Sequence, residues 1–492
     1  MEKRFTKLGT TGIFILGLIA CVFSCGRFNI PVLGWIWPAC LLFAFRTFRT
    51  RRAELLAGLV FLLAQTLRYW GYTGAGVAGD ALIGAVIGLT VLVPLMLDRM
   101  VYLRLKNRCT ACAILFAPFV FTAVVMMTDL FISMPQLAYS QGENLPLVQA
   151  SAIIGSYGVS FLLTLFGSAA AYMLAERKHR PLCVCTLVLL AVFVLGGARL
   201  AFTPTRGDGI VRMATALSPI EGDFLEDTLV SPDYEGNMTF LNEKAATAHA
   251  AGAEVLCFAE EAFEYEDVEE EKYIDAVSAI ARETGINILF PVDVADTDGS
   301  THGRSENKEF LFDREGKLVA TYYKTNLLPG MLEADSYVAG DGSILYAELP
   351  TSDGRTVNVA SVICFDSNNP RFVTGIDDRT DVLLLPSWCW DGCDAYEATA
   401  LSFRAVENNV ALVTPCVDAK STTYDWTGSI VCRTDAATTG RDGITFTNVP
   451  VRSESTRAPY HFISVWLDWI YLAGAVLLGI YTIIPAKRKK EK

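Results

Sequence analysis

Three residue types that can carry acyl chemistry each close an apolar, strand-like run of this chain. Glu260, Lys324 and Cys364 occur in that order, and the run before each is typical of a buried strand. A thiol attacks a carbonyl group as the thiolate, and a carboxylate in a dry site can remove its proton. A lysine ammonium can stabilise the oxyanion that forms. The three residues therefore predict a site that takes an acyl group onto the sulfur of Cys364 as a thioester.

Each of these residues has an ordinary structural explanation when it is taken alone. A cysteine that ends a strand is more often packed in a core, and a lysine in a loop is more often a solvated charge. Glu260 is followed by Glu261, and either carboxyl group could belong to the surface. The prediction of an acyl-transfer site therefore depends on the three types occurring together.

The chain is too apolar overall for an ordinary soluble enzyme of its size. It has 492 residues, of which 52% are hydrophobic, and its mean hydropathy is +0.35. Long apolar runs dominate residues 9–200 and 463–485, whereas residues 208–460 read as a water-soluble domain. Because a hydrocarbon core of about 30 Å needs roughly 20 apolar residues per helix, we expect a polytopic membrane protein with one soluble domain.

Eight segments are candidate membrane helices, seven before the soluble domain and one after it. They cover residues 9–26, 30–46, 53–70, 78–97, 110–132, 151–175, 181–201 and 463–485. The expected parts are a transmembrane domain over 1–207, a catalytic domain over 208–455, and a last helix with a basic tail over 456–492.

Basic residues fall on alternate sides of these helices. They occur at Lys3, Arg4 and Lys7, at Arg46, Arg49, Arg51 and Arg52, at Arg99, Arg104, Lys106 and Arg108, at Arg177, Lys178 and Arg180, and at Lys487–Lys490. Because Lys and Arg are enriched in cytoplasmic loops, we expect both termini in the cytoplasm and the soluble domain on the opposite face.

Charge and metal-ligating residues argue against two classes of site. The formal net charge of −12 is unlike that of a nucleic-acid-binding surface. The thirteen cysteines and four histidines lack the spacing of a metal site, so neither a metal nor a cofactor is expected. In an oxidising compartment some cysteines of the soluble domain could pair. The candidates are Cys257, Cys389, Cys393, Cys416 and Cys432.

Two further patterns have plain interpretations. Gly74–Gly79 spells the dinucleotide-binding pattern, but no strand precedes it, so we expect a loop between two membrane helices. The acidic run over residues 264–271 is interpreted as the solvated start of a helix.

The soluble segment alternates between strand-like and helix-like periods. Strands are expected at 209–217, 253–259, 286–291, 309–313, 318–324, 343–349, 356–364, 381–386, 410–414 and 429–433, and helices at 237–252, 267–284 and 393–409. This alternation of short apolar strands with helices and hairpins predicts an α/β layered sandwich.

Five stretches of the segment resemble the nitrilase (carbon–nitrogen hydrolase) superfamily over residues 208–450. They are Cys257–Glu260, Asp313–Pro329, Val362–Asp366, Leu383–Gly392, and the pair Arg404–Asn408 with Asp425–Gly428. The resemblance implies an αββα sandwich inserted in the helical membrane domain. It also implies Glu260 as the base, Lys324 with backbone N–H groups as the oxyanion donors, and Cys364 as the nucleophile. Supporting roles are implied for Glu333, Phe365, Asp366, Trp388, Trp390, Arg404 and Glu407.

The chain departs from the superfamily pattern at four places. Ala259 stands where Pro is common before the base, and Glu333 lies one residue later than expected. Phe365–Asp366 replaces Tyr-Glu after the nucleophile. The segment Ser387–Trp390 (Ser-Trp-Cys-Trp) replaces one of the type Asn-Asp-Ala-Trp. These changes leave the three candidate catalytic residues in place.

The arrangement of seven helices, a nitrilase-like domain and a last helix is similar to that of the apolipoprotein N-acyltransferase family. This resemblance implies a monomeric enzyme of the bacterial cytoplasmic (inner) membrane. It would move a fatty acyl chain from a phospholipid, through the Cys364 thioester, to the α-amine of the N-terminal diacylglyceryl-cysteine of a lipoprotein.

Two rival functions remain open on the sequence. One is a membrane-anchored amidase acting on a small amide, although eight helices exceed what an anchor needs. The other is a non-catalytic sensor or transporter with a degenerate domain. Transport usually leaves ionisable groups near mid-membrane, whereas Arg68, Asp80 and Asp129 lie near the ends of their segments.

Overall fold

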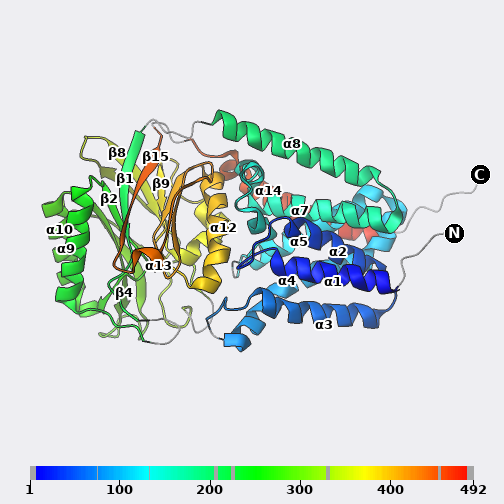
Figure 1. Cartoon of the computed structure of the whole chain (residues 1–492), viewed down its shortest axis with the longest axis horizontal. Helices are drawn as coiled ribbons and strands as arrows, with labels where there is room; N and C mark the ends of the chain where they lie inside the picture. The colour runs from blue at the N-terminus through cyan, green and yellow to red at the C-terminus, as the bar shows by residue number, and fades with distance from the viewer. Residues whose placement is uncertain are drawn as a thin grey trace, which may run out of the picture. The chain divides into compact units, whose positions relative to one another are not determined.

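The chain forms two compact units in the computed structural model. One comprises Met1–Leu200 with Phe462–Lys492, and the other Ala201–His461 (Figure 1). The structure describes residues 7–74, 76–131, 133, 135–203, 209–222, 228–328, 333–452 and 456–484. Two of the expected basic clusters, Lys3–Arg4 and Lys487–Lys490, lie outside these residues.

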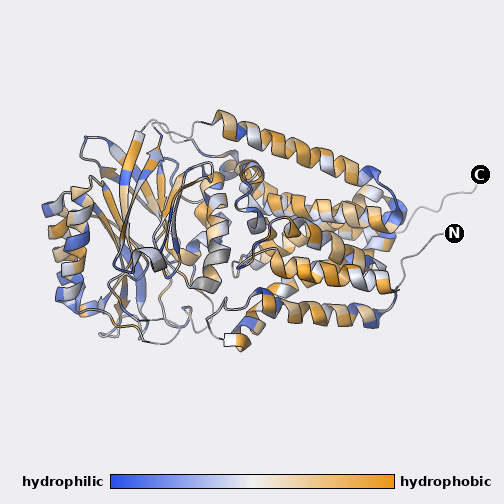
Figure 2. Ribbon diagram, in the orientation of Figure 1, coloured by the Kyte–Doolittle hydropathy of each residue, from blue (hydrophilic) through white to orange (hydrophobic). Residues whose placement is uncertain are grey.

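The first unit is helical, with one helix at each of the eight expected positions. These helices are α1 (Lys7–Phe23), α2 (Leu33–Thr47), α3 (Arg51–Arg68), α4 (Gly76–Arg108), α5 (Thr110–Thr128), α7 (Ser151–Glu176), α8 (Arg180–Phe202) and α14 (Pro459–Ile483), with short α6 (Leu145–Val148) between α5 and α7. Hydrophobic residues run along their length (Figure 2). Among the described residues, α4, α5, α7, α8 and α14 are long and apolar enough to cross a membrane, while α1 and α2 are shorter apolar helices.

Arg46 is not the loop charge that the sequence suggested. It lies in the last turn of α2 and is buried. Its Nε and Nη2 atoms donate to the Asp98 carboxylate of α4 at 2.7 and 3.0 Å, and Nη1 donates to the Ser168 carbonyl of α7 at 3.1 Å. A buried charge requires such partners, so Arg46 joins three helices.

The glycine pattern at 74–79 is only partly a loop. Gly76 begins α4, so the second half of the pattern forms the first turn of a helix. The turn before it is fixed by Asp80, which accepts hydrogen bonds from the Gly71 and Thr73 amides at 2.7 and 3.1 Å. The preceding element is helix α3 and not a strand, so these glycines do not form a dinucleotide-binding motif.

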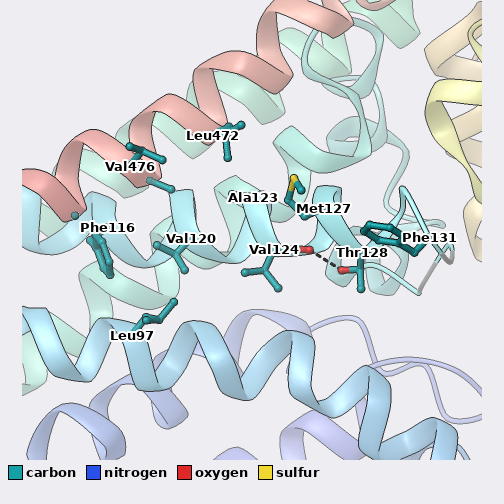
Figure 3. Close-up of a pocket in the computed structure, with 12 residues that line it drawn as sticks. Leu97, Phe116, Val120, Ala123, Val124, Met127, Thr128, Phe131, Leu472 and Val476 are labelled. Atoms are coloured by element: carbon teal, nitrogen blue, oxygen red, sulfur yellow. Dashed lines mark hydrogen bonds between the residues drawn. The ribbon is translucent and has the colours of Figure 1, made fainter.

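An apolar pocket of about 540 Å³ lies among α4, α5 and α14 (Figure 3). Its lining includes Leu97 of α4, Val120 of α5 and Leu472 of α14. The hydroxyl of Thr128, one of the few polar groups there, donates to the Val124 carbonyl at 2.5 Å. The walls of the pocket are therefore apolar, which favours contact with hydrocarbon over contact with a polar solute.

The second unit contains two mixed sheets. The first has the order β15-β1-β2-β4-β5-β6, and β3 also pairs with β4. Its strands are β1 (Gly209–Ala216), β2 (Val255–Phe258), β3 (Phe263–Glu266), β4 (Asn287–Ala295), β5 (Glu306–Phe312), β6 (Leu318–Tyr323) and β15 (Ile444–Val451). Helices α9 (Tyr234–Ala250) and α10 (Glu270–Thr284) cover it, packing Leu241 and Val277 into one core with Leu256, Ile288 and Phe290.

The second sheet has the order β14-β13-β11-β9-β8-β7. Its strands are β7 (Leu345–Pro350), β8 (Thr356–Ser361), β9 (Val382–Leu384), β11 (Ala411–Thr414), β13 (Lys420–Tyr424) and β14 (Ile430–Asp435). Helices α11 (Pro370–Val373) and α12 (Asp391–Asn408) pack on it through Val373, Leu401 and Ala405. Two further strands, β10 (Ser387–Trp388) and β12 (Cys416–Val417), pair with each other in a separate two-stranded sheet. Helices thus cover two sheets in layers (Figure 1), which confirms the predicted α/β sandwich.

The acidic run at 264–271 is only partly the helix start that was expected. Phe263–Glu266 forms β3, with Phe263 and Tyr265 buried and Glu264 and Glu266 exposed. Helix α10 begins at Glu270. Acidic residues at alternate positions leave every second side chain in water, as in an edge strand.

Candidate active site

The three candidate residues follow strands of both sheets. Glu260 comes two residues after β2, Lys324 directly after β6, and Cys364 three residues after β8. Glu260 and Cys364 line one cavity of about 70 Å³, and Lys324 is in direct contact with Glu260. The described residues that line it are Glu260, Glu261, Leu328, Glu333, Tyr337, Cys364, Trp388 and Trp390. The structure therefore brings the predicted residues together.

Lys324 is held between two carboxylates. Its Nζ atom donates to Glu260 Oε1 at 2.6 Å and to Glu333 Oε1 at 2.5 Å, and the residue is 0% exposed. Burial alone would lower the pKa of Lys324, but Glu260, Glu333 and the nearby Cys364 reverse this and raise it well above its ordinary value. The second oxygen of Glu333 accepts the Leu328 amide at 2.7 Å. Lys324 is therefore a fixed positive charge.

The two neighbouring glutamates have different partners. Glu260 Oε1 also accepts the Asn307 side-chain amide at 2.9 Å, and its Oε2 accepts the Trp388 backbone amide at 2.8 Å. Glu261 accepts the same Asn307 amide at 2.8 Å and has a positive φ of 49°. Burial, with the nearby Asp293 and Glu260 carboxyl groups, raises the pKa of Glu261. Glu260 is thus the member of the pair that contacts the lysine.

Cys364 sits at a sharp turn. Its backbone φ is +41°, a value that residues other than glycine rarely adopt and that is often found at functional turns. Its amide donates to the Pro386 carbonyl at 2.9 Å, and it begins the 3₁₀ helix η4 (Cys364–Asn368). Its sulfur is 3.8 Å from the Trp388 carbonyl oxygen and only 4% of the residue is exposed. Cys364 is therefore a buried residue that lines the cavity.

Asp366 ties η4 to the segment after β6. Its carboxylate accepts hydrogen bonds from the Tyr322 hydroxyl at 2.7 Å, the Asn326 amide at 2.6 Å and the Ile363 amide at 3.1 Å. The neighbouring Phe365 is buried. Asp366 is thus positioned to fix the turns that carry Lys324 and Cys364.

Of the residues with implied supporting roles, Glu333, Trp388 and Trp390 line the cavity, whereas Phe365, Asp366, Arg404 and Glu407 are not among its described lining residues. Arg404 and Glu407 form a fully buried ion pair within α12. Arg404 Nε also donates to the Ser367 carbonyl of η4 at 2.7 Å. The ion pair therefore supports the nucleophile's turn from outside the cavity.

Sequence reasoning missed Asn307 and Tyr337. Asn307 lies in β5 and shares its amide between Glu260 and Glu261. Tyr337 lines the cavity and its hydroxyl donates to Asp293 at 3.1 Å. A polar residue inside the apolar strand β5 was a usable signal for Asn307, whereas the sequence around Tyr337 carries none.

The arrangement of a carboxylate, an ammonium and a thiol around one small cavity can activate sulfur and stabilise an oxyanion. Within the part of the chain that the structure describes, no cluster of metal-ligating side chains includes these residues. Among the described residues, only Asp267, Asp296 and Asp298 come close enough together to hold an ion, and they lie elsewhere, partly exposed.

Comparison with known proteins assigns both units. The apolipoprotein N-acyltransferase N-terminal domain matches residues 17–169, and the carbon-nitrogen hydrolase domain matches residues 226–449. An apolipoprotein N-acyltransferase from Geobacter metallireducens is 26% identical over 301 residues, covering 56% of this chain and 57% of the relative. One from Bradyrhizobium diazoefficiens is 22% identical over 200 residues, covering 39% of this chain and 37% of the relative. The matched part of this chain thus spans about half or less of each relative.

Among solved structures, an amidase from Nesterenkonia sp. is 18% identical, with a TM-score of 0.40. The match covers 50% of this chain and 94% of the amidase chain. The two domain models lie in the same order as the two units, and both relatives carry the same name. The chain thus combines an apolipoprotein N-acyltransferase N-terminal domain with a carbon–nitrogen hydrolase domain, and it is similar to proteins of the apolipoprotein N-acyltransferase family.

Proposed function

We propose that this protein N-acylates lipoproteins, moving a fatty acyl chain from a phospholipid to the α-amine of an N-terminal diacylglyceryl-cysteine. The observation that carries the proposal is the meeting of Glu260, Lys324 and Cys364 at one cavity. The names of both relatives support this choice of substrates.

In the first step, Glu260 takes the proton of the Cys364 thiol and the sulfur attacks the phospholipid ester carbonyl. Lys324 stabilises the oxyanion, because its ammonium is already fixed and needs no rearrangement as charge develops. The carbon–oxygen bond breaks, and the proton on Glu260 passes to the departing lysophospholipid oxygen. The acyl chain remains on Cys364 as a thioester.

In the second step, the lipoprotein amine attacks the thioester. Glu260 accepts a proton from the nitrogen and returns it to the Cys364 sulfur as the carbon–sulfur bond breaks. Water would hydrolyse the thioester if it entered freely. The two indoles of Trp388 and Trp390 in the cavity lining support its exclusion.

The remaining groups have positioning roles in this proposal. Glu333 holds the Lys324 ammonium from the side opposite Glu260. Asp366 fixes the turn after Cys364, and the pair Arg404–Glu407 supports the same turn. No cofactor is needed for either step.

Both substrates are held in lipid, which agrees with the five helices long enough to cross a membrane. We place the catalytic unit on the extracytoplasmic face of the bacterial cytoplasmic membrane, with both termini inside and the protein acting as a monomer. The alternation of Lys and Arg among the loops supports this orientation.

The test is to trap the acyl group. Full-length protein in phospholipid vesicles with a labelled acyl chain should become labelled at Cys364 through a bond that hydroxylamine cleaves, and Cys364→Ala should not. Addition of a diacylglyceryl-cysteine peptide should transfer the label to its amine. Release of ammonia from a small amide, with no labelling by lipid, would instead establish the amidase alternative.

A further inference from the structure

A second cysteine, Cys389, lies next to the candidate nucleophile Cys364. Cys389 immediately follows Trp388, whose carbonyl oxygen is 3.8 Å from the Cys364 sulfur. Its own amide donates to the Val417 carbonyl at 3.2 Å, next to Cys416. Backbone hydrogen bonds alone therefore bring these cysteines together from distant parts of the sequence.

The Cys389 thiol lies within hydrogen-bonding range of three sulfurs, those of Cys364, Cys393 and Cys416. Hydrogen bonds to these sulfurs, that to Cys364 first, raise the pKa of the Cys389 thiol well above its ordinary value. Cys389 therefore stays protonated and does not compete with Cys364 for an acyl ester.

Access distinguishes the two thiols. Cys364 lines the cavity, whereas Cys389 is only 1% exposed and is not part of the lining. A small oxidant that enters the cavity therefore meets Cys364 first. A second thiol beside a cysteine that lines the cavity is the arrangement of a resolving cysteine.

We propose that Cys389 is a resolving cysteine that converts oxidised Cys364 into a reversible Cys364–Cys389 disulfide. A hydroperoxide oxidises the Cys364 thiolate to the sulfenic acid and is itself reduced to an alcohol or water. The Cys389 sulfur then bonds to the Cys364 sulfur, and its proton leaves with the sulfenic hydroxyl as water. A dithiol reductant reverses the bond by thiol–disulfide exchange and becomes a disulfide.

The disulfide would block acyl loading and protect the nucleophile from irreversible oxidation. It goes beyond the proposed acyl transfer, since formation of the bond requires the two sulfurs and a hydroperoxide but neither lipid substrate. Cys389→Ala removes only the thiol group and is therefore a suitable variant for the test.

The experiment uses full-length protein, hydrogen peroxide and peptide mapping without reduction. We expect a linked peptide joining Cys364 to Cys389, together with loss of Cys364 alkylation by iodoacetamide. Dithiothreitol should restore the alkylation. In Cys389→Ala the alkylation should be lost permanently, because Cys364 proceeds to the sulfinic acid.

Cys393→Ala and Cys416→Ala are matched controls that remove a neighbouring sulfur and should keep the Cys364–Cys389 bond. A bond from Cys364 to Cys393 or Cys416 would overturn the proposal, as would full recovery of Cys389→Ala by dithiothreitol. Cys389→Ser is a second variant for the same measurement. A disulfide without lipid labelling would refute the proposed function alone, and lipid labelling without a disulfide would refute this inference alone.

Discussion

At the scale of single residues, the two adjacent glutamates make the clearest prediction. Glu260→Gln should abolish thioester formation, because it removes the carboxylate that contacts Lys324. Glu261→Gln should keep most of the activity, since burial favours the protonated form of this residue. Labelling of Cys364 by lipid is the measurement. An inactive Glu261→Gln beside an active Glu260→Gln would show that the base is Glu261.

Lys324 should matter for rate more than for lipid binding. Lys324→Met keeps much of the side-chain volume but removes the charge held between Glu260 and Glu333. We expect acyl loading to slow by about 10²–10³, as for the loss of one oxyanion donor. Single-turnover labelling measures this, with thermal unfolding as the check on folding. A rate within a factor of about two of wild type would refute the role.

Glu309 should make stability depend on pH. It is buried in β5, and burial raises its pKa to about 8, with the Ser361 hydroxyl partly opposing this and Asp366 and Glu260 adding to it. At pH values between the ordinary pKa of 4.5 and about 8, Glu309 is ionised in the unfolded chain but still protonated in the folded chain. The free energy of unfolding therefore falls as pH rises, by up to about 1.4 kcal/mol per pH unit, and the fall ends above about pH 8.

Glu309→Gln cannot lose a proton, so its stability advantage over the wild type should grow between about pH 5 and about pH 8.5. Thermal unfolding at several pH values measures the difference. Glu283→Gln, at an exposed position, is the control and should follow the wild type. A constant difference between Glu309→Gln and the wild type would show that Glu309 is already ionised in the folded protein.

At the scale of elements, the turn after β8 depends on helix α12. Arg404→Met would leave Glu407 as an unpaired buried charge and remove the hydrogen bond to Ser367. The loss of stability should be about 3–5 kcal/mol. Arg404→Met with Glu407→Leu removes both charges and should recover most of it, as urea unfolding would measure. Equal instability of the single and double variants would assign the loss to packing.

The sequence predicted many of the elements whose pattern of hydrophobicity follows their burial, although β3 was expected as part of a helix. The strands before Glu260, Lys324 and Cys364 are apolar and were placed correctly. Strand β13 was missed because three of its four buried residues, Ser421, Thr422 and Thr423, are polar and hydrophobicity does not mark them. Asn307 and Tyr337 were missed because their roles arise from contacts between distant segments.

At the scale of the whole molecule, orientation can be tested with single cysteines. In a chain with the exposed Cys183 replaced by Ala, a cysteine at Ser300 should react with a membrane-impermeant maleimide from outside intact cells. A cysteine at Lys178, equally exposed in the first unit, should react only after lysis. The reverse result would place the catalytic unit in the cytoplasm.

The sequence located all eight long helices of the first unit, because unbroken apolar runs are easy to recognise. It did not distinguish those that can cross a membrane by themselves. α1 and α2 are too short for that test, and α3 carries several charged residues within its span. Arg46 shows the limit of counting loop charges, since its partner Asp98 comes from another helix.

The pairing of β1 with β15 has a consequence for how the two units are joined. Gly209, near the start of the catalytic unit, lies opposite Val451, near its end, so the chain enters and leaves within one strand spacing of about 5 Å. The two ends of this unit thus form a narrow neck. The entire catalytic unit could therefore be exchanged between relatives at this neck as a cassette, with the host helices left untouched.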